Sequence, residues 1–314
     1  MSSQSKQFAL SVVIVNWNTR DLLRACLASL ADECESLAGD TVQVVVVDNG
    51  STDGSAEMVS NEFPWVHFDA RRRNSGFAAA NNAGVRLTNG RYVLLLNPDT
   101  EIRPGALKTM ISFLDTHPEA GAIGPRLTNP DGSLQLSCYP VPTLLRELWR
   151  LLHLDLVRPL AVYPIDTWDS NNPHQVETVQ GACLMVRNSV LEQVGLLDEN
   201  FFVYTEEIDF CRRVASKGWA LYWLPTALVV HYGGQSTRQA ATKMFIQLYR
   251  SKLQYFRKHY GVVGGFAYKL ILLLAILPRI TVAPLAWPFS SLQREKLRSV
   301  SRLYGLLLLE LKTL

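Results

Sequence analysis

Apolar and polar positions in the first half of the chain follow a pattern typical of buried strands joined by helices. Short apolar runs, as expected for strands buried on both faces, occur at Leu10–Val15, Val44–Val47 and Tyr92–Leu96, the first of them rich in β-branched residues. Apolar residues recur at helical spacing over residues 22–30 and again over 78–87. Strands joined by helices imply a mostly parallel sheet with right-handed crossovers. The pattern therefore predicts an α/β fold.

The second half is less regular. Pro104 is suited to be the first residue of a helix that carries apolar positions 107–114. Residues 129–175 contain six prolines and show no clear period, so we interpret them as an irregular insertion on the acceptor side. Order returns in three predicted elements: a strand over Val179–Val186, a helix over Glu206–Lys217 and a strand over Ala220–Leu224.

The C-terminal region differs in composition from the rest. Val262–Phe289 is strongly apolar but is interrupted by Lys269 and Arg279, and its uncharged stretches are shorter than the roughly 20 residues of a spanning helix. Ser290–Leu314 mixes basic residues with leucines. We interpret it as a basic amphipathic helix on a membrane surface, the alternative being a helix packed on the domain.

Length and charge define the domain organisation. The chain has 314 residues, of which 48% are hydrophobic, enough for one large domain and an appendage. Residues 250–314 carry a net charge of +9 and the remainder −6, so a polyanionic partner is expected for the tail alone. We predict a domain over 1–240, with a nucleotide-binding half at about 8–125 and an acceptor-side half at about 126–240, followed by a helical, membrane-associating tail over 241–314.

Several functional classes are disfavoured by the residues. Five scattered cysteines without a C-x-x-C pair argue against a disulfide framework and a zinc site and fit a reducing cytosol. The polar N-terminus shows no secretory signal. Neither a G-x-G-x-x-G nor a P-loop motif is present, which removes the commonest dehydrogenase and NTPase interpretations, and no nucleic-acid partner is expected.

Polar residues follow three of the predicted strands, where ligands bind in parallel sheets. Asn16 and Trp17 follow the first, and the tryptophan is equally compatible with stacking on a nucleobase and with a place in the core. Asp48 follows the second and is suited to accept the N–H of a uracil or thymine ring, while Ser51 and Thr52 are expected to cap the next helix. Asn97-Pro-Asp99 follows the third, and its carboxylate is a ligand suited to Mg²⁺ or Mn²⁺.

Three acids open the helix predicted from residue 206. Glu206, Glu207 and Asp209 exceed what interaction with the helix dipole requires. Neighbouring carboxylates raise one another's pKa, which suits one of them to act as a general base. His231 follows an apolar run, and a lone histidine is more often structural than a ligand, so its assignment depends on the other motifs.

Together these motifs resemble the family-2 inverting glycosyltransferases of GT-A fold, and the Asn-Pro-Asp variant is most similar to bacterial rhamnosyltransferases. The resemblance covers most of residues 9–237, in the family's order, through SVVIVNWNTRDLLRACLASL, VVVVDNGSTDGS, NSGFAAANNAGV, YVLLLNPDTEIRPGAL, GACLMVRNSVLEQVGLLDENFFVYTEEIDFCRRVASKGW and VVHYGGQST. It implies a Rossmann-like, mostly parallel mixed sheet flanked by helices.

The resemblance also implies roles for individual residues. The nucleotide-binding set comprises Asn16, Trp17, Asp48, Ser51, Asn74, Gly76 and Asn97. Asp99 corresponds to the surviving acid of the family's D-x-D metal motif and His231 to its distant metal ligand, for Mg²⁺ or Mn²⁺. Glu207 corresponds to the catalytic base, with Glu206 and Asp209 beside it. Two departures matter: Asn97 replaces the first acid of D-x-D, and Glu207 replaces Asp.

The expected reaction is a single in-line displacement with inversion, from a dTDP- or UDP-sugar to a hydroxyl of a glycan or lipid-linked acceptor. The enzyme is expected to be cytoplasmic and peripheral on the cytoplasmic face of the membrane. A sugar nucleotidyltransferase is one alternative, but it requires a Gly-rich triphosphate loop where this chain has Asn-Trp-Asn. A non-catalytic glycan-binding module is the other, and it leaves the acids at 206–209 unexplained.

Overall fold

The computed structural model describes residues 7–37, 42–235, 239–281 and 291–311, and the chain forms two compact units. Unit 1 comprises residues 1–141, 164–202 and 206–236. Unit 2 comprises residues 142–163, 203–205 and 237–314. A segment from the middle of the chain therefore clusters with the C-terminal helices.

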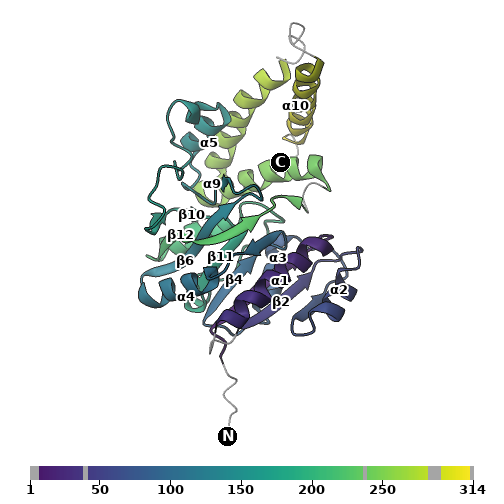
Figure 1. Ribbon diagram of the computed structural model, residues 1–314. Coiled ribbons are helices and arrows are strands. Elements are labelled where there is room, and N and C mark those ends of the chain that lie inside the picture. The colour runs from purple at the N-terminus through teal and green to yellow at the C-terminus, as the bar shows by residue number, and fades with distance from the viewer. Residues whose placement is uncertain (1–6, 38–41, 236–238, 282–290, 312–314) are drawn as a thin grey trace. The chain divides into compact units, whose positions relative to one another are not determined.

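Unit 1 contains a mixed sheet whose described strands number ten, eight of them in the order β3-β2-β1-β4-β11-β6-β12-β5 (Figure 1). The strands β3, β2, β1 and β4 are parallel, β11 is antiparallel to β4 and β6, and β12 is parallel to β6. This confirms the predicted α/β class with a mostly parallel sheet. The sheet strands are β1 (Leu10–Asn16), β2 (Val42–Asp48), β3 (His67–Ala70), β4 (Tyr92–Leu96), β5 (Thr100–Ile102), β6 (Ala120–Thr128), β7 (Leu134–Gln135), β9 (His174–Val176), β11 (Cys183–Arg187) and β12 (Ala220–His231).

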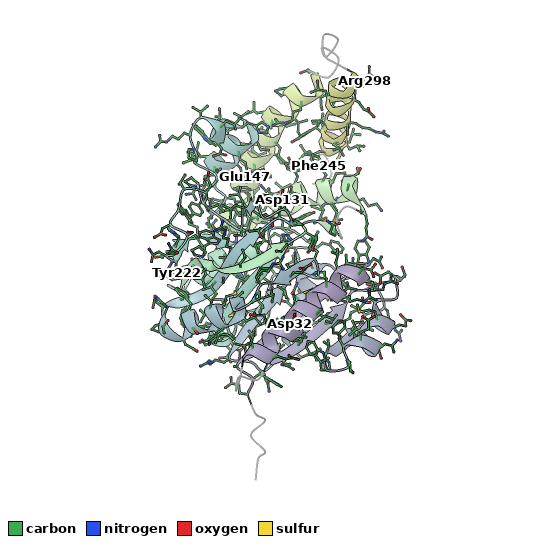
Figure 2. All side chains as sticks on the ribbon, viewed as in Figure 1. Asp32, Asp131, Glu147, Tyr222, Phe245 and Arg298 are labelled. Atoms are coloured by element: carbon green, nitrogen blue, oxygen red, sulfur yellow. The ribbon has the colours of Figure 1, made fainter. Side chains whose placement is uncertain are left out.

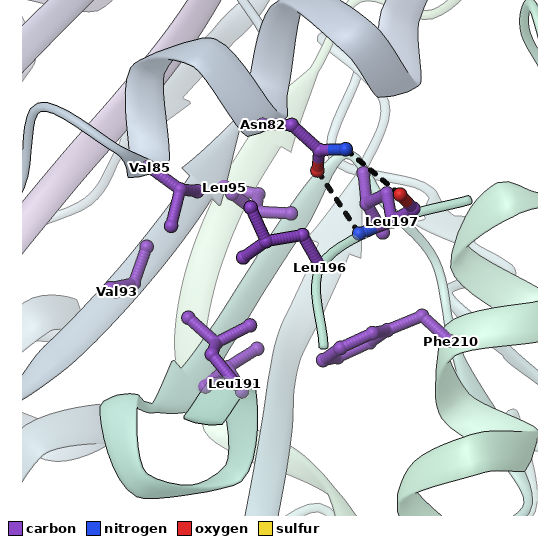
Figure 3. Close-up of a pocket in the computed structure, with 9 residues that line it drawn as sticks. Asn82, Val85, Val93, Leu95, Leu191, Leu196, Leu197 and Phe210 are labelled. Atoms are coloured by element: carbon purple, nitrogen blue, oxygen red, sulfur yellow. Dashed lines mark hydrogen bonds between the residues drawn. The ribbon is translucent and has the colours of Figure 1, made fainter. Parts of the chain in front are cut away.

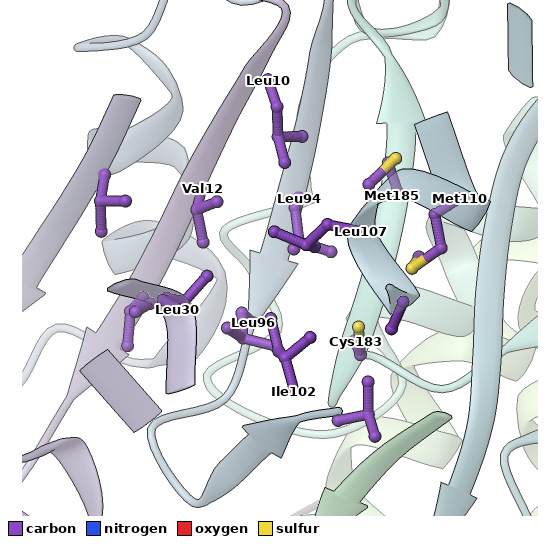
Figure 4. Close-up of a cluster of buried hydrophobic side chains, with 14 of the residues drawn as sticks. Leu10, Val12, Leu30, Leu94, Leu96, Ile102, Leu107, Met110, Cys183 and Met185 are labelled. Carbon is purple, nitrogen blue, oxygen red and sulfur yellow. The ribbon is translucent and has the colours of Figure 1, made fainter. Parts of the chain in front are cut away.

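Helices cover both faces of this sheet. On one face, α1 (Arg20–Ser36), α2 (Ser55–Glu62) and α4 (Ala106–Thr116) bury leucines and methionines against alternate residues of β1, β2 and β4. Figure 4 shows part of this core, where Val12, Leu94 and Leu96 lie near Leu30 and Leu107. Burial on this face is nearly complete because every residue of β1 and β4 is buried.

The other face is covered by α3 (Phe77–Val85), α6 (Asn188–Val194) and α7 (Glu206–Ser216). Small residues let α3 approach closely, since a Cβ at Gly84 would lie 2.4 Å from Val13 Cγ1. Asn82 of α3 accepts from the Leu197 N–H at 3.0 Å and donates to the Leu197 carbonyl at 2.8 Å. Figure 3 shows these two bonds beside a small cavity bordered by Leu95 and Phe210. These contacts fix the loop that leads to α7.

Unit 2 consists of helices: α5 (Leu144–Leu151), the short 3₁₀ helix η1 (Leu154–Leu156), α9 (Ala241–Thr281) and α10 (Ser291–Glu310). Helix α9 breaks at Gly261, whose φ of 69° and ψ of −170° are not helical. Glu147 of α5, labelled in Figure 2, is buried and accepts from Lys252 Nζ at 2.8 and 3.0 Å and from Arg150 at 2.8 Å. An ion triad thus joins α5 to α9.

Two predicted helix starts are wrong. Helix α4 begins at Ala106 rather than Pro104, because Gly105 adopts a left-handed conformation (φ 83°) and the Glu33 carboxylate accepts from the Gly105 and Leu107 N–H groups at 2.6 and 3.0 Å. Ser51 and Thr52 do not cap α2, which begins at Ser55 after Gly54 (φ 82°).

The predicted strand over Val179–Val186 is two strands. β10 (Thr178–Val179) pairs with β8 (Cys138–Tyr139) in a separate small sheet, whereas β11 begins at Cys183 and joins the main sheet. Conversely, β12 runs on from the predicted Ala220–Leu224 to His231, because its second half pairs with β5 as well as β6. The irregular region 129–175 contains short elements, among them α5. All five cysteines are free thiols.

Candidate active site

Asn16, at the end of β1, organises the first part of the site. In the register of β1 and β2 it lies directly beside Asp48. Thr19 Oγ1 donates to Asn16 Oδ1 at 2.7 Å, which fixes the orientation of the amide. The Asn16 Nδ2 group donates to Asp48 Oδ1 at 2.8 Å, Ser55 Oγ at 2.9 Å and Ser51 Oγ at 3.1 Å. Because Asn16 and Asp48 are buried and hydrogen-bonded to their neighbours, this network holds the ends of β1 and β2 in a fixed arrangement.

The turn after β1 is tied to the same network. Ser51 Oγ accepts from the Asn18 N–H at 2.9 Å, and the Ser51 N–H donates to Asp48 Oδ2 at 2.9 Å. Asn18 has a φ of 51°, and its side chain accepts from the Thr52 N–H at 2.8 Å. Trp17, between these bonded residues, is only partly buried. Part of the Trp17 side chain is therefore accessible to an aromatic ring that stacks on it.

Asn49, which no sequence pattern singles out, links β2 to the turn before α3. Its Nδ2 group donates to Asn74 Oδ1 at 3.0 Å and to the Gly76 carbonyl at 3.2 Å, while its Oδ1 accepts from the Ser75 N–H at 2.9 Å. Gly76 has a φ of 93°, and a Cβ there would lie 2.6 Å from the Phe202 carbonyl oxygen. Asn74 and Gly76 are therefore positioned beside Asp48 through Asn49.

His231, the last residue of β12, is held by Gln135. The Gln135 Nε2 group donates to Asn129 Oδ1 at 2.9 Å and to the His231 carbonyl at 3.3 Å, so its Oε1 faces the ring. His231 Nδ1 lies 2.6 Å from that Oε1 and therefore carries the proton. The other nitrogen, Nε2, then presents a lone pair, the arrangement that orients metal-ligating histidines in proteins.

Two oxygen-bearing side chains lie around this nitrogen. Asp99 Oδ1 is 3.4 Å and Asn97 Nδ2 is 3.5 Å from His231 Nε2. Asn97 Oδ1 is buried and has no hydrogen-bond partner. A carboxylate, an imidazole lone pair and an unpartnered amide oxygen are ligands that fit a divalent cation. Within the described residues no three His, Cys, Asp or Glu side chains form a metal cluster, so the fit depends on the neutral Asn97 oxygen as well.

The acids that open α7 differ in their environment. Glu206 is buried, its Oε2 has no partner, and burial together with the Glu207 charge raises its pKa well above the ordinary value. Glu207 is only partly buried. Of the two carboxyl groups, Glu206 is therefore the one whose environment favours the protonated form.

Asp209 is a buried anchor. Its carboxylate accepts from Arg213 Nε at 2.9 Å, and the same guanidinium donates to the Val194 and Leu196 carbonyls at 2.6 and 2.7 Å. These bonds hold the loop after α6 against α7. Tyr204, two residues before α7, adopts a φ of 68°, a strained backbone of the kind that gathers at functional sites.

The predicted residues form three groups. Asn16, Asp48 and Ser51 share one network with Trp17 in its turn, and Asn74 and Gly76 join it through Asn49. Asn97, Asp99 and His231 form the second. The acids of α7 form the third group, which lies next to the second. The Asn97 N–H donates to the Ala182 carbonyl at 2.9 Å. Gly181, the neighbour of Ala182, lies close to Glu207, since a Cβ at Gly181 would be 3.4 Å from Glu207 Cβ. Such an arrangement can bind a nucleotide diphosphate and deprotonate a hydroxyl beside it.

Comparison with known proteins agrees with this chemistry. Residues 11–154 match Glycosyl transferase family 2, and residues 92–309 match Glycosyl transferase family group 2. The chain is 31% identical to the N-acetylglucosaminyl-diphospho-decaprenol L-rhamnosyltransferase of Mycobacterium tuberculosis, over 73% of this chain and 77% of that protein. It is 29% identical to a low-salt glycan biosynthesis hexosyltransferase of Haloferax volcanii, over 65% and 61% of the two chains.

Solved structures of similar fold support the predicted GT-A architecture. A mannosyltransferase from Pyrobaculum calidifontis, solved with GDP-Man and Mn²⁺, is similar over 97% of this chain and 86% of its own, with a TM-score of 0.58 and 17% identity. The structure of GalNAc-T7 with UDP, GalNAc and Mn²⁺ is similar over 72% of this chain and 44% of its own, with a TM-score of 0.55 and 15% identity. By fold and by sequence, the chain belongs to the family-2 glycosyltransferases.

Proposed function

We propose that this glycosyltransferase moves a sugar, with inversion, from a dTDP- or UDP-sugar to a hydroxyl of a glycan or lipid-linked acceptor. The observation that carries the proposal is the proximity of the α7 acids to the group of Asn97, Asp99 and His231. Glu207 lies beside Gly181, and the neighbouring Ala182 carbonyl accepts from the Asn97 N–H. A base next to a diphosphate-binding group is what a direct displacement requires.

The nucleotide is assigned to the first network. Trp17 supplies a ring for stacking on the base, and Asp48 supplies a carboxylate to accept its imide N–H. Asn74 and Gly76 are assigned to the side of the nucleotide, where Gly76 allows the close approach of the Phe202 backbone. Asn16 and Ser51 hold Asp48 in place.

A divalent metal, Mg²⁺ or Mn²⁺, is assigned to the second group. Asp99, His231 and the Asn97 amide oxygen would hold it. When bound, such an ion neutralises the charge of the departing diphosphate. The Mn²⁺ ions named with the two structural neighbours support this assignment.

Glu207 is assigned as the catalytic base. Its carboxylate takes the proton of the acceptor hydroxyl while that oxygen forms a bond to the anomeric carbon. The bond from the anomeric carbon to the diphosphate oxygen breaks, and the electron pair leaves with the diphosphate. Glu206, whose pKa is raised well above the ordinary value by burial and by the Glu207 charge, favours its protonated form, and Asp209 positions the helix through Arg213.

The acceptor class follows from the relatives. The mycobacterial relative is named as a rhamnosyltransferase acting on N-acetylglucosaminyl-diphospho-decaprenol. We therefore propose rhamnose as the sugar, a polyprenyl-diphosphate glycan as the acceptor, and a peripheral position on the cytoplasmic face of the membrane.

The test is a transfer assay with dTDP-rhamnose and UDP-sugars, with and without a short-chain polyprenyl-diphosphate N-acetylglucosamine. Product formation with an inverted anomeric centre is the expected result. Binding of glycan without donor turnover supports a glycan-binding module instead, and diphosphate release from a nucleoside triphosphate supports a nucleotidyltransferase. Either result contradicts the proposal.

A further inference from the structure

The second half of α9 exposes a row of apolar side chains. Beyond the break at Gly261, residues separated by three or four positions fall on one face of the helix. Their exposed fractions are large: Val262 86%, Val263 80%, Phe266 62%, Leu270 46%, Leu274 60% and Leu277 52%. We call these six residues the apolar stripe. A monomeric protein rarely leaves so continuous an apolar surface in water.

The charged residues of the same segment face the interior of unit 2. Residues 262–281 contain two, Lys269 and Arg279. Lys269 Nζ donates to the Leu311 carbonyl at 3.3 Å. Arg279 donates to the Ala275 and Leu151 carbonyls at 2.7 and 2.5 Å. This arrangement is the opposite of that in a helix that faces water: the two cations hydrogen-bond within unit 2, and the apolar side chains are exposed.

The opposite side of the same helix is packed within unit 2. Tyr268, Leu272 and Ile276 are fully buried, and Figure 1 shows α5 and α10 beside α9. Among the described residues, α9 is the one helix long and apolar enough to cross a membrane by length and composition. A helix packed along one side and apolar along the other is suited to lie in the plane of a membrane interface.

Basic residues identify the kind of surface that the stripe fits. Arg257 and Lys258, in the turn of α9 before the Gly261 break, are exposed, as are Arg302 and Arg298 on α10, the latter labelled in Figure 2. Residues 250–314 carry a net charge of +9. An exposed apolar face in a basic segment matches an anionic bilayer, since each Lys or Arg near such a surface adds to the binding.

We propose that the apolar stripe is a docking surface for an anionic lipid bilayer, on which the second half of α9 lies in the interface plane. The proposal rests on the proposed function in one respect: docking on a bilayer is useful because it brings the enzyme to a lipid-linked acceptor. It assigns the contact to one helix face.

The test is flotation of the full-length protein with phosphatidylcholine vesicles, with and without phosphatidylglycerol. Phe266→Ser combined with Leu270→Ser should lower the partition coefficient at least about tenfold, because two exposed side chains no longer enter the bilayer. Arg257→Gln combined with Lys258→Gln should weaken binding to the anionic vesicles only. Added salt should reduce the binding of the wild type without abolishing it.

The matched control is Trp65→Ser combined with Leu87→Ser, which removes two apolar side chains of unit 1 that are 46% and 42% exposed. These variants should bind vesicles like the wild type. All variants should keep the wild-type melting temperature, since the stripe is exposed. Truncation is avoided because it would remove the buried Tyr268 and Leu272.

Three results would overturn the proposal. The first is equal vesicle binding by the stripe variant and the wild type, and the second is membrane binding that resists alkaline carbonate extraction. The third is a wild type that is dimeric in solution and a stripe variant that is monomeric, while neither binds vesicles. The second indicates a spanning helix and the third an interface between two copies. Transfer to a water-soluble acceptor analogue should be unchanged in the stripe variant. Vesicle binding without any transfer contradicts the proposed function but leaves the docking surface intact.

Discussion

Gln135 Oε1 lies 2.6 Å from His231 Nδ1, and the Gln135 amide is itself oriented by its bond to Asn129 at 2.9 Å. This contact leaves His231 Nε2 as the nitrogen that faces Asp99. A glutamine in a region without recognisable sequence pattern thus determines which atom of a distant histidine is available to a cation.

Replacing Gln135 should therefore weaken the metal site without removing a ligand. Gln135→Ala is expected to raise the Mn²⁺ concentration needed for half-maximal activity by about 10- to 100-fold, the usual effect of losing the residue that orients a ligating histidine. Gln135→Glu should restore much of the loss, because a carboxylate also accepts from Nδ1. Gln175→Ala, an exposed position, is the control. Equal metal dependence in all three variants would contradict this role.

Replacing the proposed metal ligands should have a larger effect on metal dependence than replacing Gln135. Asp99→Asn and His231→Ala should each weaken divalent-metal dependence and diphosphate binding, while binding of the nucleoside monophosphate is less affected. Calorimetric titration with both nucleotides, with and without Mn²⁺, measures the difference. Full activity of the wild type in excess chelator would exclude a metal requirement.

The base assignment has a direct test. Glu207→Gln should keep donor binding and lower turnover by about 10²- to 10⁴-fold, the usual contribution of general-base catalysis. Asp209→Asn should mainly lower the melting temperature, because the bond to Arg213 is weakened. If Glu207→Gln retains near wild-type turnover and Asp209→Asn does not, the two assignments are exchanged.

The elements that the sequence predicts well are those in which local pattern and burial agree. β1, β2 and β4 lie within one or two residues of prediction, because short, continuous apolar runs bounded by polar residues are typical of strands buried on both faces. Since parallel strands end at one edge of a sheet, the pairing of Asn16 with Asp48 follows from their positions alone.

What the sequence could not show depends on contacts between distant residues. Gln135 and His231 are 96 residues apart, and Lys252 and Glu147 are 105 apart, so no local period connects them. Asn49 lies in a D-N-G-S run that is also typical of ordinary turns. The start of α4 was mispredicted because Glu33, on another helix, binds its first N–H groups.

Glu206 should make stability depend on pH. Burial and the Glu207 charge raise its native pKa above the ordinary 4.5, so the unfolded state ionises first as pH rises and the native state loses stability above that value. The melting temperature of the wild type should therefore fall as pH increases above 4.5 relative to that of Glu206→Gln, which cannot ionise. Exposed Glu57→Gln should behave like the wild type. Parallel curves for Glu206→Gln and the wild type would show that Glu206 is not desolvated.

The ion triad of unit 2 should have the opposite dependence. Burial alone would raise the pKa of Glu147, but the Lys252 ammonium and the Arg150 guanidinium lower it to about 2. A depressed native pKa stabilises the fold above the unfolded value of 4.5, and this contribution is lost as pH falls from there toward about 2. Acid should therefore unfold unit 2 in that interval.

Glu147→Gln tests the triad at neutral pH. It leaves Lys252 buried without its counter-charge, so unit 2 should lose about 3–5 kcal/mol of unfolding free energy, measured by denaturant titration. Glu147→Leu combined with Lys252→Met should recover much of that loss, because both buried charges are removed together. Equal loss in the single and double variants would instead assign the effect to packing. Equal stability of Glu147→Gln and the wild type would show that the triad does not hold α5 to α9.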